Sequence, residues 1–234
     1  KGSDQTALDV WINERRLDPV VIKRAGVVCA QRNFLSKLLE SEKNRSVKRE
    51  YIGDLEDAYL IRKLIPGVTG NRHLPLSVGS DESNRYIDYF IADRIIFPIH
   101  NEMGLLMGLA GRALTNSPDS TAPKYQFTRE FPKATVLYRA EYAFKLIRSE
   151  VKKGGKNLVI YLCEGFLDAL RFESLGFPAV AVMGSSISEH QVKLLHSLSL
   201  SLPKSTKLTV VVSFDRDEAG LRGAADACLK LMNA

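Results

Sequence analysis

Cysteine and histidine are scarce in this sequence of 234 residues, which holds three cysteines and four histidines. Cys29, Cys163 and Cys228 lie far apart, are odd in number and form no C-x-x-C pair, which argues against a disulfide framework and a cysteine zinc site. The histidines show no metal-ligand spacing either. We therefore expect no zinc in this chain, and any metal ion must be held by carboxylates.

Long hydrophobic runs are also missing. No run approaches the roughly eighteen apolar residues that a membrane-spanning helix needs. The opening Lys1-Gly2-Ser3 is followed by no apolar stretch, so it resembles an expression remnant more than a signal peptide. We expect a cytoplasmic protein without a membrane partner.

Charge is present in both signs with a modest basic excess. Thirty-three Lys and Arg against 27 Asp and Glu give a formal net charge of +6. Such an excess permits a polyanionic partner, but a solvated lysine-rich surface gives the same number, so charge alone leaves nucleic-acid binding open. The hydrophobic content of 45% is that of a globular protein, long enough for one large domain or two small ones.

The first two thirds of the chain predict a mixed organisation. Residues 4–64 carry apolar residues at helical spacing, and residues 66–84 and 115–122 have the composition of loops. Two strand-like runs, 94–100 and 105–114, predict a hairpin closed by Gly104, and a helix is expected over 140–152. The Lys- and Gly-rich stretch at 152–156 indicates a boundary, so we expect one domain over 1–153 and a second over 154–234.

The last third predicts a parallel sheet. Three short apolar, β-branched runs at 157–163, 179–183 and 207–214 alternate with helical patterns, as in right-handed βαβ units whose strands are buried on both faces. Ser188 and Gln191 fit the capping box of a helix that begins near Ser188.

Acidic residues follow the first and third of these strands. Glu164 comes directly after one, and Asp215 and Asp217 come after the other, where open parallel sheets bind their ligands. Three carboxylates without a neutralising histidine repel one another, and Mg²⁺ with its preference for hard oxygen ligands would remove that cost. The alternative is that these acids, and Asp168 one turn after Glu164, are ordinary charges at helix N-termini.

The pair Glu164-Gly165 and Asp215-x-Asp217-x-x-Gly220 resembles the Toprim signature, which primases, topoisomerases and certain nucleases and repair proteins share. Other segments resemble the catalytic core of bacterial DNA primases in particular, with the hairpin segment as the most specific match. In chain order they are 15–27 (RRLDPVVIKRAGV), 93–114 (DRIIFPIHNEMGLLMGLAGRAL), 123–125 (PKY) with Lys133 and 137–138 (LY), 164–168 (EGFLD), 184–186 (GSS) and 214–220 (FDRDEAG). This resemblance implies an α/β fold with a Toprim-type parallel sheet flanked by helices, preceded by a smaller α+β subdomain specific to primases.

The same resemblance implies an enzyme that makes short RNA primers on single-stranded DNA from ribonucleoside triphosphates, by nucleotidyl transfer with Mg²⁺ or, as a substitute, Mn²⁺. The implied metal ligands are Glu164, Asp215 and Asp217, with Asp168 as a further catalytic residue. The implied nucleotide- and DNA-binding residues are Arg112, Lys124, Tyr125, Lys133 and Tyr138. For the lysines the alternative is a solvated surface charge, and for the two tyrosines it is core packing.

The sequence also departs from the family pattern. Arg216 stands where primases carry a glycine, and the further acidic segment of the family, D-x-E-D-P-D, does not follow before Ala234. Neither a zinc-binding template module nor a helicase-binding tail is present, so we expect a fragment of a longer protein, whose replicative helicase would be contacted through other regions. Two alternatives stay open: a Toprim nuclease or topoisomerase fragment, and a nucleic-acid-binding module without activity.

Overall fold

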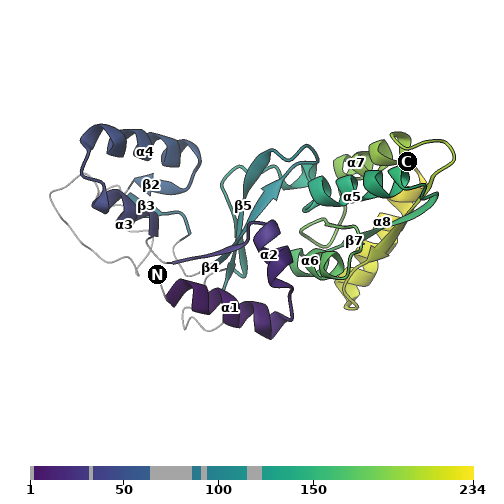
Figure 1. The fold of residues 1–234 in the computed structure, drawn as a ribbon, viewed down its shortest axis with the longest axis horizontal. Coiled ribbons are helices and arrows are strands. Elements are labelled where there is room, and N and C mark those ends of the chain that lie inside the picture. Colours follow the sequence, from purple (N-terminus) through teal and green to yellow (C-terminus); the bar gives the residue numbers. More distant parts are fainter. Residues whose placement is uncertain (1–2, 32–33, 64–85, 91–93, 115–122) are drawn as a thin grey trace. The chain divides into compact units, whose positions relative to one another are not determined.

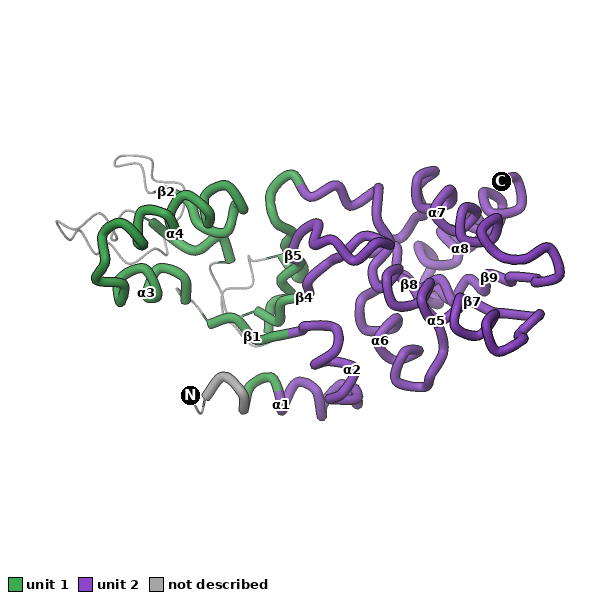
Figure 2. The backbone as a smooth tube through the Cα atoms, turned by 45° about the horizontal axis from the view of Figure 1, so that its top comes forward, with its two compact units in different colours: residues 1–8, 28–96, 110–130 green, residues 9–27, 97–109, 131–234 purple. Residues whose placement is uncertain are grey.

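The structure of this chain is a computed structural model, in which residues 3–31, 34–63, 86–90, 94–114 and 123–234 are described. It divides into two compact units (Figure 2). Unit 1 consists of residues 1–8, 28–96 and 110–130, and unit 2 of residues 9–27, 97–109 and 131–234. The loops predicted at 66–84 and 115–122 lie outside the described residues, and the predicted domain boundary near 153 stays a prediction.

Unit 1 contains most of a four-stranded antiparallel sheet in the order β1-β4-β5-β6. Val28 of β1 (Val28–Ala30) pairs with Ile96 of β4 (Arg94–His100), and Ala110 of β5 (Leu106–Ala113) pairs with Phe127 of β6 (Tyr125–Phe127). The unit boundary falls within β4 and β5. The predicted hairpin is confirmed, because β4 and β5 are joined by a turn in which Gly104 has a φ of +87°, a conformation that suits glycine.

A second group of elements in unit 1 comprises two helices and a two-stranded sheet. These are α3 (Phe34–Ser41), α4 (Arg45–Asp57), β2 (Ile61–Lys63) and β3 (Tyr86–Asp88). Helix α3 begins where the buried Asp88 carboxylate accepts hydrogen bonds from the N–H groups of Leu35 and Ser36. The expectation of a mainly helical segment over 4–64 is confirmed for its helices, and the structure adds the short strands β1 and β2.

Unit 2 is built around a parallel sheet in the order β8-β7-β9. Its strands are β7 (Asn157–Cys163), β8 (Ala179–Ala181) and β9 (Lys207–Ser213). Its helices are α2 (Pro19–Arg24), α5 (Ala140–Lys152), α6 (Phe166–Ser174), α7 (Glu189–Leu200) and α8 (Glu218–Met232), together with most of α1 (Ser3–Arg15) and the 3-10 turn η2 (Lys133–Thr135). Its strand β7 is labelled in Figure 1, with α5, α6, α7 and α8. The predicted strands, the helix over 140–152 and the capping box of Ser188 and Gln191 are all confirmed.

The expectation that the strands are buried on both faces is wrong for β9 and for the first half of β7. Leu158 and Ile160 point into the core that α5, α7 and α8 cover, whereas Val159 between them is 38% exposed and Val211 of β9 is 37% exposed. On the opposite face α6 packs mainly on β7 and β8. A helix one strand away from β9 cannot cover that strand, and this explains the exposure.

The N-terminal part of unit 2 is fixed by a buried ion-pair network. Glu173 on α6 accepts two hydrogen bonds from Arg139, at 2.8 and 3.0 Å, and one from Arg24 of α2 at 2.9 Å. The Glu173 and Arg139 side chains are 2% and 5% exposed, so the bidentate pairing compensates charges that have been taken out of water. Among the described residues, no helix has both the length and the apolar composition needed to cross a bilayer.

Candidate active site

The predicted acidic residues lie at one edge of the parallel sheet of unit 2. Strands β7 and β9 run parallel with Cys163 opposite Ser213, so the residues that follow both strands leave the sheet side by side. Glu164 follows β7 directly, and its Oε1 accepts a hydrogen bond of 3.0 Å from the N–H of Asp215. The structure thus brings Glu164 and Asp215 together across neighbouring strand ends, as the sequence predicts.

Asp217 has a structural role in addition to its place at this edge. It is the N-cap residue of α8, and its Oδ1 accepts a hydrogen bond of 2.8 Å from the N–H of Gly220. The alternative that Asp217 is an ordinary charge at a helix N-terminus therefore holds for one of its two carboxylate oxygens, Oδ1. Since an N-cap uses a single side-chain oxygen, the cap and a metal ligand are compatible roles for one carboxylate.

The electrostatics of this edge show that the acids influence one another. Partial burial and the negative charges of Asp215, Asp217 and Asp168 raise the pKa of the Glu164 carboxyl, and the hydrogen bond from the N–H of Asp215 opposes that shift. Like charges in close proximity disfavour ionisation, and a cation between them would reverse this effect. The edge therefore has the chemistry of a cation site.

The three carboxyl groups do not form a closed set of ligands in this structure, contrary to the expectation that all three would lie within reach of one ion. In the part of the chain that the structure describes, no group of three or more His, Cys, Asp and Glu side chains is placed to hold a metal ion. Glu164 and Asp217 instead accept hydrogen bonds from backbone N–H groups, which stabilise the carboxylates without bringing their mutually repelling charges closer. The donor set fits Mg²⁺ in kind, because it consists of hard carboxylate oxygens on two neighbouring strand ends.

Gly220 allows α8 to begin against this edge. A Cβ atom at position 220 would lie 2.2 Å from the backbone oxygen of Asp215 and 2.7 Å from Oε1 of Glu164. Both distances are far below van der Waals contact, so a side chain would push the two acidic residues out of place. The glycine of the Asp215-x-Asp217-x-x-Gly220 motif is thus required by the close approach of helix and strand end.

Lys133 is a predicted basic site residue that unit 2 contributes near the sheet edge. It lies in η2, and its Nζ would be 2.9 Å from a Cβ at Gly184, which follows β8. Its side chain is partly buried, and this burial lowers the pKa of its ammonium group. Lys133 therefore stands at the carboxyl end of β8, on the same side of the sheet where Glu164 follows β7.

The other predicted basic residues belong to unit 1. Arg112 is 8% exposed, and its guanidinium donates a hydrogen bond of 3.0 Å to the hydroxyl of Tyr125 on the neighbouring strand. Lys124 is exposed beside them. These residues and Lys133 lie in different units, and their joint role in binding nucleotide and DNA stays a prediction.

Tyr138 is a core residue, so its predicted contact with a DNA base is wrong in this structure and the core-packing alternative holds. It is 1% exposed, and its ring packs on Phe166 and Phe97 with centroid distances of 4.7 and 6.4 Å. Its backbone also forms a bridge with Ala181 of β8. Phe166 directly follows Glu164-Gly165, so this aromatic contact helps to hold the start of α6.

Arg94 is a buried charged residue that the sequence analysis did not single out. Arg94 is fully buried, donates to the backbone oxygens of Gly111 and Pro123, and has two nitrogens, Nε and Nη2, without a hydrogen-bond partner. Burial lowers its pKa. A buried arginine in an apolar β-run such as RIIFPIH is the available sequence signal, since such a run normally holds no charge.

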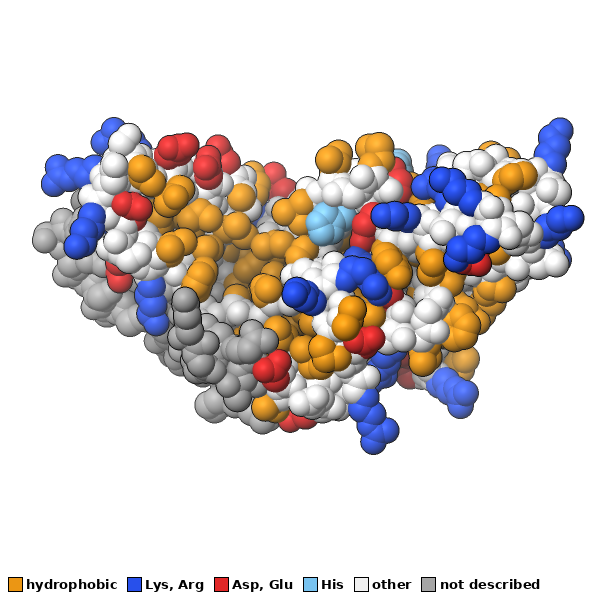
Figure 3. Space-filling model, in the orientation of Figure 1, with side chains coloured by type: hydrophobic (Ala, Val, Ile, Leu, Met, Phe, Trp, Pro, Cys, Tyr) orange, Lys and Arg blue, Asp and Glu red, His pale blue; other side chains and the backbone are white. Residues whose placement is uncertain are grey.

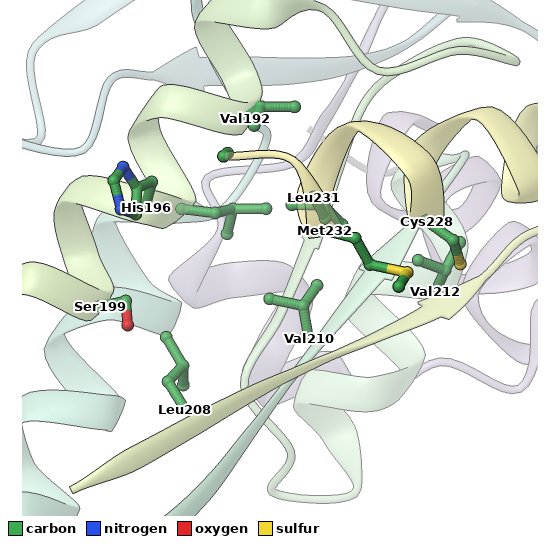
Figure 4. Close-up of a pocket in the computed structure, with 11 residues that line it drawn as sticks. Val192, His196, Ser199, Leu208, Val210, Val212, Cys228, Leu231 and Met232 are labelled. Carbon is green, nitrogen blue, oxygen red and sulfur yellow. The ribbon is translucent and has the colours of Figure 1, made fainter.

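A hollow elsewhere on unit 2 has a different character. Figure 4 shows it between α7, β9 and α8, with a volume of about 350 Å³. Its lining is largely apolar, and His196, Ser199 and Cys228 are among the few polar groups. It contains none of the predicted site residues. On the face drawn in Figure 3, basic side chains are spread over many places, so charge does not mark a single patch there either.

Comparisons with known proteins agree with this geometry. Residues 161–234 match a family described as Toprim-like, and residues 69–144 match the N-terminal domain of the DNA primase catalytic core. The DNA primase of Campylobacter jejuni is 32% identical over 169 residues, which are 69% of this chain and 25% of that protein.

Solved primase structures share the fold. The zinc-binding and RNA polymerase domains of Aquifex aeolicus primase align with 95% of this chain and 46% of theirs, at a TM-score of 0.68 and 23% identity. A DnaG primase catalytic domain bound to single-stranded DNA aligns with 95% of this chain and 58% of its own, at a TM-score of 0.61 and 24% identity.

A parallel sheet that carries Glu164-Gly165 after one strand and Asp215-x-Asp217 after its neighbour defines a Toprim-type domain. The match of residues 69–144, which precede this domain in the chain, narrows the assignment from Toprim proteins in general to DNA primases. The chain belongs to the bacterial-type DNA primases and corresponds to their catalytic core. It spans about a quarter of the length of the curated relative described above.

Proposed function

We propose that this chain is the catalytic core of a DNA primase, which joins ribonucleotides on a single-stranded DNA template by metal-dependent nucleotidyl transfer. The observation that carries the proposal is the hydrogen-bonded pairing of Glu164 with Asp215 at adjacent parallel strand ends, within a chain that matches both parts of the primase core. Protein groups in such reactions mainly position the reactants and stabilise charge.

In this proposal Glu164, Asp215 and Asp217 hold Mg²⁺, for which Mn²⁺ can substitute. When bound, the ion would supply positive charge that offsets the negative charge of the substrate phosphates. Asp168, in the first turn of α6, adds negative charge near Glu164 and is a further candidate for this role. Gly220 leaves room for the Asp215 backbone and the Glu164 carboxylate beside the start of α8, and this supports the assignment of both residues to one site.

The basic residues would bind the anionic substrates. Lys133 supplies a compact positive charge at the carboxyl end of β8, where the triphosphate of an incoming ribonucleotide would lie. Lys124 is exposed and suited to the backbone of the template. Arg112 donates a hydrogen bond to the Tyr125 hydroxyl and its guanidinium lies over the ring, 5.5 Å from the centroid. The tyrosine ring is the candidate surface on which an unpaired base stacks.

The direct test is a primer-synthesis assay. This chain is incubated with single-stranded DNA, labelled ribonucleoside triphosphates and Mg²⁺ or Mn²⁺, with the full-length parent protein assayed in parallel. We expect short labelled RNA from the parent, faint synthesis from this chain that Mn²⁺ enhances, and none from Asp215→Asn in either form. Cleavage of the DNA without RNA synthesis by the parent would instead support a Toprim nuclease.

A further inference from the structure

Gln191 lies in an unusual position for a helix-capping residue. It is 2% exposed, and its Oε1 accepts a hydrogen bond of 3.0 Å from the N–H of Ser188, as the capping box of α7 requires. Its Nε2, which the capping box does not use, lies 2.8 Å from the backbone oxygen of Val136 and 3.3 Å from that of Lys133. One side chain therefore caps α7 and grips the segment that carries Lys133.

Ser188 repeats this double use. Its hydroxyl accepts a hydrogen bond from the N–H of Gln191, which completes the cap, and donates one of 2.6 Å to the backbone oxygen of Ala134. Ala134 is the central residue of η2. The capping box thus holds the carbonyl groups of Lys133, Ala134 and Val136, and these contacts go beyond what beginning a helix requires.

The turn η2 needs this support. It is a three-residue 3-10 turn whose N-cap, Pro132, makes no side-chain capping hydrogen bond. A single turn of this kind has poor hydrogen-bond geometry and little stability of its own. Its position over the loop after β8 is therefore set by α7, to which η2 packs.

We propose that Gln191 and Ser188 are positioning residues for Lys133, and that the start of α7 fixes the Lys133 ammonium where the triphosphate of the incoming ribonucleotide is bound. This inference rests on the role that the proposed function gives to Lys133. Neither residue touches the substrate; both act by holding the backbone from which the lysine stem extends past Gly184.

A double-mutant cycle tests the inference. The probe is a fluorescent ribonucleoside triphosphate with Mg²⁺, titrated against the wild type, Gln191→Met, Lys133→Ala and the double variant. Methionine keeps the length of glutamine but has neither the amide donor nor the acceptor. We expect each single substitution to weaken binding by about tenfold, and Gln191→Met to have no further effect when Lys133 is absent, because coupled residues are not additive.

Two further variants separate positioning from folding. Ser188→Thr keeps both hydroxyl hydrogen bonds and should bind like the wild type, whereas Ser188→Ala should lose affinity. Asn44 caps α4 by accepting from two N–H groups, so Asn44→Ala should lower the melting temperature to a similar degree as Ser188→Ala without changing nucleotide affinity.

The outcomes separate this inference from the proposed function. The positioning role is wrong if Gln191→Met weakens nucleotide binding equally with and without Lys133. It is also wrong if Gln191→Met leaves binding unchanged while Lys133→Ala weakens it. In both cases the nucleotide site itself stands. If Lys133→Ala leaves binding unchanged, the assignment of Lys133 in the proposed function fails, and the inference fails with it. Should Gln191→Met not fold, the Ser188→Thr and Ser188→Ala pair decides in the same way.

Discussion

The backbone N–H of Asp215 donates a hydrogen bond of 3.0 Å to the side chain of Glu164, although 51 residues separate them in the chain. The bond joins the ends of two parallel strands and fixes the spacing of the two acidic segments. Its geometry depends on how closely α8 approaches the two acidic segments.

Gly220→Ala should damage both stability and the acidic edge. The added Cβ would overlap the backbone oxygen of Asp215, and we expect a loss of roughly 1–3 kcal/mol in unfolding free energy and a loss of metal-induced stabilisation. Gly53→Ala is the matched control, because Gly53 lies in α4 with nothing within 4 Å of its added Cβ. That variant should be more stable by up to about 1 kcal/mol. Thermal unfolding with and without Mn²⁺ measures both the stability and the metal-induced stabilisation. If Gly220→Ala unfolds like the wild type under both conditions, the close approach of α8 is unnecessary.

Asp217→Asn should separate capping from metal binding. Asparagine caps helices as well as aspartate, so stability without metal should change little. A metal at about ten times its dissociation constant adds roughly 1.4 kcal/mol to the unfolding free energy, and the variant should lose this gain. Asp18→Asn, at the N-cap of α2, carries the same substitution outside the site and should keep it. An unchanged response to Mn²⁺ in Asp217→Asn would leave Asp217 as a helix cap alone.

Glu141 should make stability depend on pH. Burial raises its pKa above the ordinary 4.5, although the positive charges of Arg139 and His100 oppose the shift; Glu173 adds to it. The folded state therefore binds a proton more readily than the unfolded state, so stability falls as pH rises from about 4.5 through the raised pKa. Glu141→Gln removes this contribution. Its melting temperature relative to the wild type should increase across that pH window, and a difference that stays constant with pH would contradict the shifted pKa.

Lys124→Ala should weaken binding of single-stranded DNA without lowering the melting temperature, because an exposed lysine contributes little to stability. The affinity of this chain should fall steeply with salt, with a log-log slope on the order of two to four and little sequence preference. The substitution should reduce that slope by about one unit. Lys204→Ala, in the turn that precedes β9, is the control with the same loss of charge. Equal effects of both variants would mean that net charge, and no particular contact, governs binding.

Local patterns predicted the parallel sheet well. Strand β7 (Asn157–Cys163) and helix α5 (Ala140–Lys152) have the bounds expected from the sequence. Each is long enough for its pattern to be recognised, β7 as a β-branched apolar run and α5 as a helical repeat over several turns. Strands β1 and β2 were missed because three residues are too few to show a period. Val28–Ala30 becomes a strand only through pairing with β4. Its residue Cys29 pairs with Ile95, which is 66 positions further along the chain.

The acidic residues of the candidate site could be predicted from the sequence, but the residues that hold the site in place could not. Glu164 and Asp215 follow strands, so their meeting at one edge follows from topology. The exclusion of Tyr138 from the surface depends on Phe97 and Phe166, which lie far from it in sequence. The second use of Gln191 depends on carbonyl groups more than 50 residues away, and no local pattern encodes these.

The bond between Arg24 and Glu173 bears on the order in which the chain folds. The two residues are 149 positions apart, so during synthesis α2 leaves the ribosome long before its partner on α6 exists. The loop that this contact closes is costly in entropy, whereas the βαβ segments from Ala140 onward close much shorter loops. The sheet of unit 2 should therefore assemble first and receive α2 as one of its last elements. Pulsed hydrogen exchange during refolding would then show protection in β7 and α5 before it appears in Val21 and Ile22.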